Sequence, residues 1–466
     1  MMNALQSSGM LAAMAPQAML AVALGGTLLS GILLKDKAAA LARAIAFAGI
    51  LAAGAALLAG PLGPSVEAMS RVDGAAKAWE ALFLLAALAF LAVGRLPGDR
   101  SIALFLGSLI GMCLIAVADN LILLFIALET MSLPTYLLVH GLRPGRRSLE
   151  AAVKYFFAGA AASALFLLGL AVRYAATGSF SIETADASAG SFLGLALMGS
   201  AALFKVGAFP FMFWLPDVYE AAEPEFSGFM STAVKAAGFL LLLRLLEGHS
   251  AAAAALTDWL PALAAGPMTF GNLLALRQKS LQRLLAYSSI AHVGYLLAAT
   301  WAWGAQGGSV ERLDTLWFYL AGYLFMNTGA FLFLLCTGVR DADALRGFGR
   351  RAPWLSGFFI LMLLSLGGIP PTMGFLAKFF VIWELIKAGG IWLAAVFALN
   401  SLAALGYYLR LVRLIAFEDT VEGTAQAPAP AGAGALAVMA VCAAATLLLG
   451  LAPAVRDILF ASFFAG

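Results

Sequence analysis

Long apolar segments recur along almost the whole of this 466-residue sequence, and they constrain its fold more than any other feature. A helix needs about 20 mostly apolar residues to cross the hydrocarbon core of a membrane, where only helices and closed barrels satisfy the backbone. The segments are continuous in Leu, Ala and Phe, without the polar–apolar alternation of barrel strands. They predict an all-α polytopic membrane protein with about fourteen transmembrane helices, centred near residues 24, 50, 86, 109, 129, 162, 201, 236, 266, 293, 326, 370, 400 and 444.

The composition agrees and excludes other classes. Hydrophobic residues make up 63% of the chain and charged residues 11%, whereas soluble domains carry roughly 25% charged residues. A net charge of +3 gives no reason to expect a nucleic-acid partner. Cys113, Cys336 and Cys442 lie far apart inside apolar segments, so we expect neither a disulfide framework nor a metal or cofactor site in this chain.

Loop charges predict the topology. The first charge, Lys35, follows the first apolar segment, which favours a retained span over a cleaved signal peptide. Most lysines and arginines fall in loops that follow odd-numbered spans, and cytoplasmic loops carry an excess of these residues. We therefore expect a multi-pass membrane protein with both termini facing outward. The acidic segment 217–225 is an exception to this pattern, and the Ala/Pro/Gly-rich segment 422–434 predicts a connecting loop.

Five ionisable residues lie inside apolar spans: Glu129, Lys154, Lys205, Lys235 and Lys378. A lysine at the centre of a membrane helix costs roughly 2.5–3.5 kcal/mol, so such residues normally face each other or a hydrated cavity. Burial makes it easier for a lysine to lose its proton, whereas an arginine keeps its charge. The pattern predicts a mid-membrane proton relay with Glu129 as the counter-ion of the lysines.

Other readings of these residues stay open. A lysine near a helix end can extend its ammonium group to the headgroups, above all Lys154, and Glu129 can be a purely structural carboxylate. His292, in the segment LLAYSSIAHVGY, can extend the proton path or be an ordinary core histidine. His140 is a weaker candidate, and His249 is expected in a loop.

Two of the lysines lie beside helix breakers. Gly207 and Pro210 follow Lys205, while Pro370 and Pro371 precede Lys378. Paired interruptions in corresponding halves are typical of inverted-repeat transporters. The alternative is an ordinary proline kink in each helix, which the occurrence of a break beside a lysine twice argues against.

We accordingly predict two inverted five-helix repeats, formed by spans 4–8 and 9–13, with spans 7 and 12 broken. The expected divisions are a three-helix segment 1–100, a first repeat 101–250, a second repeat 251–416, and a loop with a final helix 417–466.

Several segments resemble one known family. They are ALFKVGAFPFMFWLPDVYEAAEP, STAVKAAGFLLLLRLL, GNLLALRQKSLQRLLAYSSIAHVGYLL and SLGGIPPTMGFLAKFFV. They are similar to subunit N of bacterial NADH–quinone oxidoreductase (respiratory complex I), in the Mrp-antiporter-like family, over roughly residues 100–415. The resemblance implies a proton-translocating membrane-arm subunit of a translocase enzyme, without a redox centre of its own. It also implies antiporter-like partner subunits in the same membrane, with NADH, FMN, iron–sulfur clusters and quinone bound by partners.

The resemblance also implies roles for single residues. Glu129 matches the span-5 glutamate, Lys205 its partner lysine, Lys235 the connecting lysine, Lys378 the lysine near the exit, and Lys154 a further span-6 lysine. The chain departs from the family at Met212, where many relatives have a histidine, and at 220–224, which replaces a Gly-Ala-Pro sequence.

Two rival functions fit the same sequence. One is a subunit of a Mrp-type cation/proton antiporter or a membrane-bound hydrogenase, and the other is a scaffold subunit that does not pump.

Overall fold

The structure is a computed structural model that describes residues 14–34, 38–60, 63–66, 69–93, 96–184, 186–247, 251–308, 313–419, 432–452 and 454. Both chain ends, His249 and nearly all of the predicted loop 422–434 lie outside these residues.

The predicted spans are present as helices. In the described part of the chain, 13 helical segments are long and apolar enough to cross a membrane. The predicted span centred near residue 370 is divided between α17 (Pro353–Gly367) and α18 (Met373–Lys387), each of 15 residues. The prediction of an all-helical polytopic chain is confirmed, and the inverted relation of the two repeats stays a prediction.

Residue contacts divide the chain into two compact units. Unit 1 comprises residues 1–205, 233–256 and 460–466, and unit 2 comprises residues 206–232 and 257–459. These two units differ from the four segments predicted from the sequence. The four segments describe expected repeats along the chain, whereas the units describe which residues pack together, so the four segments stay a prediction.

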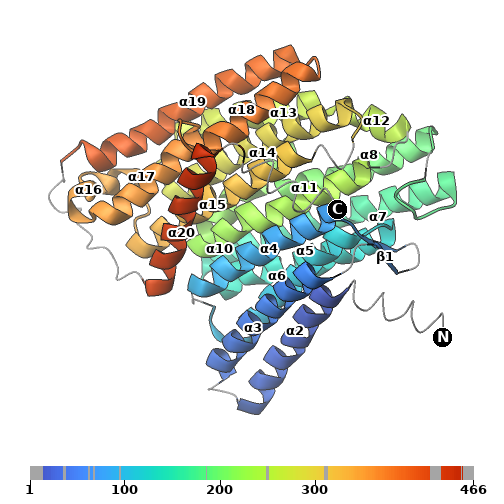
Figure 1. Ribbon diagram of the computed structural model, residues 1–466, viewed down its shortest axis with the longest axis horizontal. Coiled ribbons are helices and arrows are strands. Elements are labelled where there is room, and N and C mark those ends of the chain that lie inside the picture. Colours follow the sequence, from blue (N-terminus) through green and yellow to red (C-terminus); the bar gives the residue numbers. More distant parts are fainter. Residues whose placement is uncertain are drawn as a thin grey trace. The chain divides into compact units, whose positions relative to one another are not determined.

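Unit 1 is a bundle of long apolar helices with one short hairpin. It contains, wholly or mainly, α2 (Ala15–Leu34), α3 (Ala38–Ala59), β1 (Gly63–Val66), β2 (Ser70–Val72), α4 (Gly74–Val93), α5 (Gly98–Val117), α6 (Leu121–Gly141), α7 (Arg146–Thr177), α8 (Ala189–Val206), α11 (Lys235–Leu246) and α12 (Ala251–Thr257). Helix α2 packs on α3 and α5, and α5 packs on α6 (Figure 1). A Cβ at Gly111 of α5 would lie 2.3 Å from the backbone nitrogen of Met131. Only glycine therefore permits α5 and α6 to approach this closely.

Unit 2 contains the remaining elements. They are, wholly or mainly, η2 (Phe211–Phe213), α9 (Trp214–Ala221), α10 (Pro224–Phe229), the π-helical turn η3 (Met230–Val234), α13 (Leu260–Leu276), α14 (Leu281–Ala305), α15 (Asp314–Thr337), η5 (Ala342–Leu345), α16 (Phe348–Arg351), α17, α18, α19 (Ile391–Ala416) and α20 (Ala433–Leu451). Helix α15 contacts α10, α17, α18 and α20, while α14 contacts α9, α13 and α18. These two helices form the centre of unit 2.

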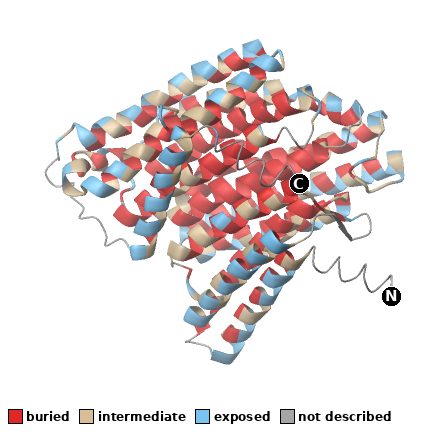
Figure 2. Cartoon of the chain, viewed as in Figure 1, coloured by how far each residue is buried: buried red, intermediate tan, exposed pale blue. Residues whose placement is uncertain are grey.

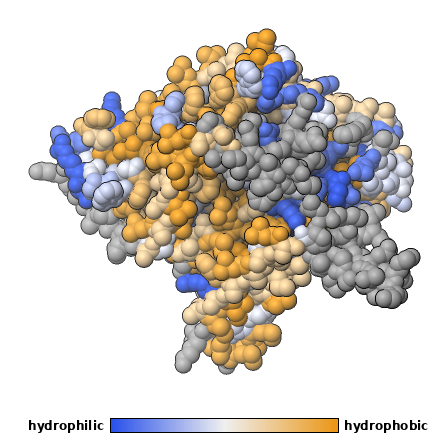
Figure 3. Space-filling model, viewed as in Figure 1, coloured by the Kyte–Doolittle hydropathy of each residue, from blue (hydrophilic) through white to orange (hydrophobic). Residues whose placement is uncertain are grey.

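The pattern of burial matches helices in lipid. Large apolar side chains such as Val22 (72% exposed) and Leu58 (80% exposed) are exposed. Residues 225–246, by contrast, are all buried, and Figure 2 shows the distribution of buried and exposed residues. Apolar residues cover much of the surface seen in Figure 3. In water such a surface would favour association or aggregation, so the bilayer is the solvent that suits it.

The acidic exception to the loop-charge pattern has a structural explanation. Arg283 at the start of α14 donates to the carboxylates of Asp217 at 2.8 Å and Glu220 at 3.0 Å. The acidic segment is therefore compensated by a basic residue at the start of α14.

Candidate functional site

Lys205 lies in the last turn of α8, beside the predicted helix break. The helix ends at Val206, and Gly207 has a φ of 77°. This left-handed conformation favours glycine and is a common way to end a helix. The chain then continues through η2, which contains the buried Met212, before α9 resumes the helical path.

The partners of Lys205 are tyrosines. The side chain is 3% exposed, and its Nζ donates a hydrogen bond to Oη of Tyr155 at 3.2 Å. The same Nζ lies 5.0 Å from the ring centroid of Tyr136 and 5.2 Å from that of Tyr155. An ammonium over aromatic faces is stabilised electrostatically, and more so where water is excluded. The phenol of Tyr155 is a hydroxyl through which a proton can leave.

Glu129 of α6 acts on Lys205 without touching it. It is half-buried and accepts a hydrogen bond from Oγ of Ser163 on α7. The structure shows no direct ion pair between Glu129 and Lys205, both of which it describes, although their charges interact electrostatically. Tyr136 lies seven residues beyond Glu129 and so on the same face of α6. The same face of α6 therefore carries Glu129, whose charge acts on Lys205, and Tyr136, whose ring lies against Lys205.

Lys235 is the first residue of α11 and is 1% exposed. Every residue of α11 is buried. The π-helical turn η3 immediately precedes it, and such turns are rare and frequently found at functional sites. Lys235 is therefore fully buried directly after an irregular turn, and its relay role stays a prediction.

Lys378 of α18 binds the end of the broken helix. Its Nζ donates to the carbonyl oxygens of Leu366 at 2.8 Å and Gly367 at 3.0 Å, at the C-terminus of α17. Gly368 follows with a φ of 87°. Because the last carbonyls of a helix lack helical partners and carry partial negative charge, they stabilise an ammonium group. The break therefore creates the binding site for the lysine.

A buried polar network extends from His292 of α14. The ring nitrogen Nδ1 lies 2.9 Å from Oη of Tyr319, and the imidazole packs against Tyr323 with ring centroids 4.8 Å apart. The hydroxyl of Tyr323 accepts a bond of 3.1 Å from Asn327, which also donates to Ser231. His292 thus lies among hydroxyls and amides rather than in an apolar core.

A second part of the network lies against Lys378. Its Nζ is 5.3 Å from the ring centroid of Tyr295, whose hydroxyl accepts a bond of 3.1 Å from Asn272. Asn272 in turn accepts a bond of 3.0 Å from Tyr407. Sequence reasoning missed most of these residues, because tyrosine and asparagine are common in spans. The Tyr, Ser and His cluster in LLAYSSIAHVGY was the available signal.

Lys154 differs from the other lysines. Its side chain is 51% exposed, and Nζ pairs with Glu150 of the same helix at 2.8 Å. Its neighbour Tyr155 faces inward, so Lys154 lies on the outer face of α7. A relay role for Lys154 stays a prediction. In the described residues no three His, Cys, Asp or Glu side chains are grouped to hold a metal ion.

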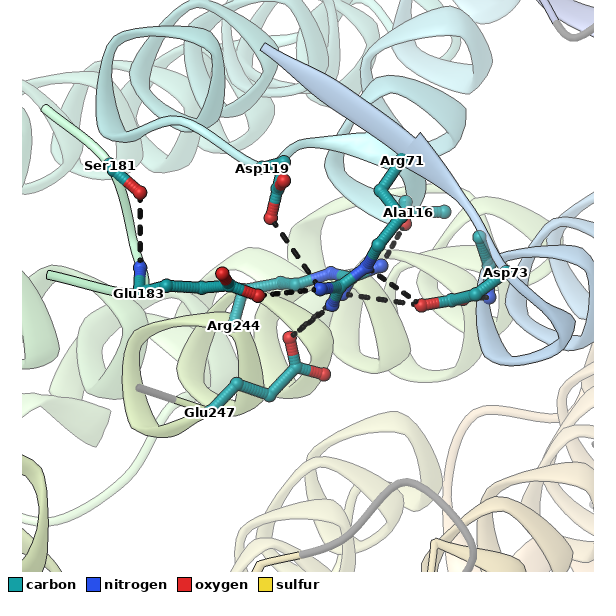
Figure 4. A network of polar contacts seen from close by, with 9 residues as sticks. Arg71, Asp73, Ala116, Asp119, Ser181, Glu183, Arg244 and Glu247 are labelled. Atoms are coloured by element: carbon teal, nitrogen blue, oxygen red, sulfur yellow. Dashed lines mark hydrogen bonds and ion pairs between the residues drawn. The ribbon is translucent and has the colours of Figure 1, made fainter. Parts of the chain in front are cut away.

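A cluster of ion pairs lies at one end of the helices of unit 1 (Figure 4). Arg71 pairs with Asp73 at 3.1 Å, Glu183 at 3.0 Å and Glu247 at 3.4 Å, and lies 3.8 Å from Asp119. Arg244, 1% exposed, pairs with Glu247 at 2.8 Å. Since Arg244 lies on α11, the cluster fixes the end of the helix that carries Lys235.

Two acids of unit 1, Asp119 in this cluster and Asp186 outside it, should respond oppositely to pH. Burial raises the pKa of Asp119, and Glu183 and Glu247 add to this against the opposing effect of Arg71. Hydrogen bonds from Ser188 hold the pKa of Asp186 below its ordinary value. A raised acid pKa means that ionisation of Asp119 costs stability as pH rises, whereas ionised Asp186 adds stability that is lost at low pH.

We therefore expect Asp119→Asn to raise the melting temperature of the purified complex at neutral pH, with the gain shrinking as pH falls. Asp186→Asn, the matched control, should lower it slightly. Melting curves between about pH 4 and 8 would measure both effects. Equal responses of the two variants would contradict this account of the cluster.

Comparisons with known proteins agree with this architecture. The family model described as NADH:quinone oxidoreductase/Mrp antiporter, TM, matches residues 118–403. NADH-quinone oxidoreductase subunit N of Trichlorobacter lovleyi is 36% identical over 428 residues, covering 86% of this chain and 87% of the relative. Subunit N 2 of Rhizobium meliloti is 35% identical over 432 residues, covering 87% of each chain.

Solved structures share the fold. A chain of the respiratory complex I from Thermus thermophilus with bound aureothin has a TM-score of 0.84 at 33% identity, covering 95% of this chain and 99% of that chain. A chain of the Mrp complex from Dietzia sp. DQ12-45-1b has a TM-score of 0.81 at 20% identity, covering 99% of this chain and 98% of that chain, a likeness of fold alone. The chain therefore belongs to the NADH:quinone oxidoreductase/Mrp antiporter family, and within it to the subunit N group of NADH–quinone oxidoreductase.

Proposed function

We propose that this chain is a proton-translocating membrane-arm subunit of an NADH–quinone oxidoreductase. The observation that carries the proposal is the set of three lysines, Lys205, Lys235 and Lys378, each at most 5% exposed within apolar helices. Such residues are costly in a membrane and normally serve transport. The redox cofactors and the oxidation of NADH belong, in this proposal, to partner subunits.

The first step takes place at Lys205. A negative charge on Glu129 favours the ammonium form of Lys205, although the two side chains do not touch. Protonation of Glu129 removes that stabilisation, so Lys205 releases its proton more readily, and Tyr155 offers the nearest hydroxyl. Redox chemistry in the partners would bias this pair through charge and conformation.

The later steps take place at Lys235 and Lys378. We propose that Lys235 receives the proton and that Lys378 delivers it toward the far side of the membrane. Carbonyls at the end of α17 hold the ammonium form of Lys378, which suits a group that must keep a proton until release is triggered. Many relatives have a histidine at the position of Met212. In this chain we propose that Tyr295, Asn272 and His292 supply the polar groups along this part of the proton path.

We further propose that the chain lies in the bacterial inner membrane with both termini on the periplasmic side. The excess of lysine and arginine in the odd-numbered loops supports this orientation. The acidic segment 217–225 is the exception, and Arg283 compensates it by pairing with Asp217 and Glu220. Labelling of a cysteine introduced near either end, with a reagent that does not cross membranes, would test it.

Replacement of Lys205 by methionine tests the proposal directly. We expect the assembled complex to oxidise NADH but to move fewer protons per NADH into sealed vesicles, because methionine cannot carry a proton. The matched control is Lys387→Met, which removes an exposed lysine paired with Glu384. If Lys205→Met assembled normally and pumped as the unmodified complex does, the proposal would be refuted. A scaffold subunit would instead show altered assembly with unchanged coupling.

A further inference from the structure

Glu80 is a buried acid on a helix that carries none of the three relay lysines. It is part of α4, in the N-terminal three-helix segment, and is 1% exposed. Its partner is Gln17 of α2, which is 5% exposed. The mechanism proposed above does not use either residue.

The hydrogen bonding of this pair is incomplete for an ionised acid. The amide nitrogen Nε2 of Gln17 donates to Oε1 of Glu80, while the amide oxygen of Gln17 is buried without a hydrogen-bond partner. A carboxylate can only accept, so it leaves this oxygen unsatisfied. A protonated carboxyl adds one O–H donor, and acid and amide can then form a closed pair of two hydrogen bonds.

The surroundings provide little to stabilise a negative charge. Lys77, one turn away on α4, acts on Glu80 only through its charge, while its ammonium group donates to the carbonyl oxygen of Gly60 at 2.6 Å. Cys113 of α5 is fully buried nearby and is not a cation. An isolated carboxylate taken out of water is very costly, and such a group is normally neutralised instead. In the described residues no cation forms an ion pair with Glu80, and the amide oxygen of Gln17 lacks a donor. A proton bound to the carboxyl group resolves both.

We propose that Glu80 is a second proton-binding site of this chain, in which the protonated carboxyl and the amide of Gln17 clamp α2 to α4. The ligand is a single proton held outside the lysine path. Loss of that proton breaks one hydrogen bond and places a charge between the two helices. The proton on Glu80 does not take part in pumping. The proposal for Glu80 would therefore hold even if Lys205→Met showed that this subunit does not pump protons.

Isotope-edited infrared spectroscopy of the intact complex tests the proposal. At neutral pH, Glu80→Gln should remove one carbonyl band of a protonated carboxylic acid. In the unmodified complex this band should shift only slowly in deuterated water, because the buried carboxyl proton exchanges slowly for deuterium. Glu183→Gln, at a side chain that is 68% exposed, is the control and should remove an ionised carboxylate band instead. If Glu80→Gln removed an ionised band, the proposal would be overturned.

Assembly of the complex provides a second readout. Glu80→Gln should assemble normally and pump the same number of protons per NADH, because two amides can also form two hydrogen bonds. Glu80→Leu leaves the Gln17 amide unpaired and should lower the folded fraction roughly tenfold or more. Failure of Glu80→Gln to assemble would show that a charge is required there and would overturn the proposal.

Discussion

Replacement of Lys235 by methionine is expected to abolish proton transfer through this subunit while the complex stays assembled. Lys235 is 1% exposed and begins a helix whose residues are all buried. Its ammonium group costs roughly 2.5–3.5 kcal/mol on insertion into a membrane. Methionine has a similar length and no charge, so the substitution removes this cost together with the proton carrier.

The measurement is the number of protons moved per NADH in sealed vesicles, together with the yield of assembled complex. The contribution of this subunit to the protons moved per NADH should be lost, with a yield equal to or above that of the unmodified complex. Lys235→Arg is the matched variant, because it keeps the charge but does not release a proton near neutral pH. Normal pumping by Lys235→Arg would contradict a relay that requires a deprotonated lysine.

Replacement of Lys378 by methionine is expected to cost both pumping and stability. Lys378 is the donor to the carbonyls of Leu366 and Gly367 at the end of α17. Without it these two buried acceptors lose a partner, at a cost of about 1–3 kcal/mol each. Lys378→Met should therefore lower the melting temperature of the complex, whereas Lys235→Met should not. Both variants should lose pumping through this subunit.

Lys378→Arg separates the two roles of this lysine. A guanidinium keeps donors for both carbonyls, so the melting temperature should recover while pumping stays impaired. The melting temperature and the protons per NADH would be measured on the same preparations. Recovery of both by Lys378→Arg would show that the lysine only closes the helix break.

The sequence determined where the chain crosses the membrane and which lysines lie within it. These features are local, because a span needs only about 20 apolar residues and a helix ends where Gly or Pro removes its hydrogen bonds. The break before Lys378 was predicted from Pro370 and Pro371, and α17 ends at Gly367. Subunit N was identified from sequence segments alone, and relatives and solved structures agree.

The partners of the charged residues were decided only by the tertiary structure. The sequence predicted Glu129 as the counter-ion of the lysines, and only the structure shows that two tyrosines of neighbouring helices lie against Lys205. Lys154 and Tyr155 are adjacent in sequence, yet one is exposed and the other is buried.

The buried pair of Glu80 and Gln17 joins residues 63 positions apart and was missed from the sequence. Consecutive helical residues point about 100° apart, so helix rotation and packing decide which side chain meets a partner. That rotation depends on all neighbouring helices together, and no single segment of sequence contains it.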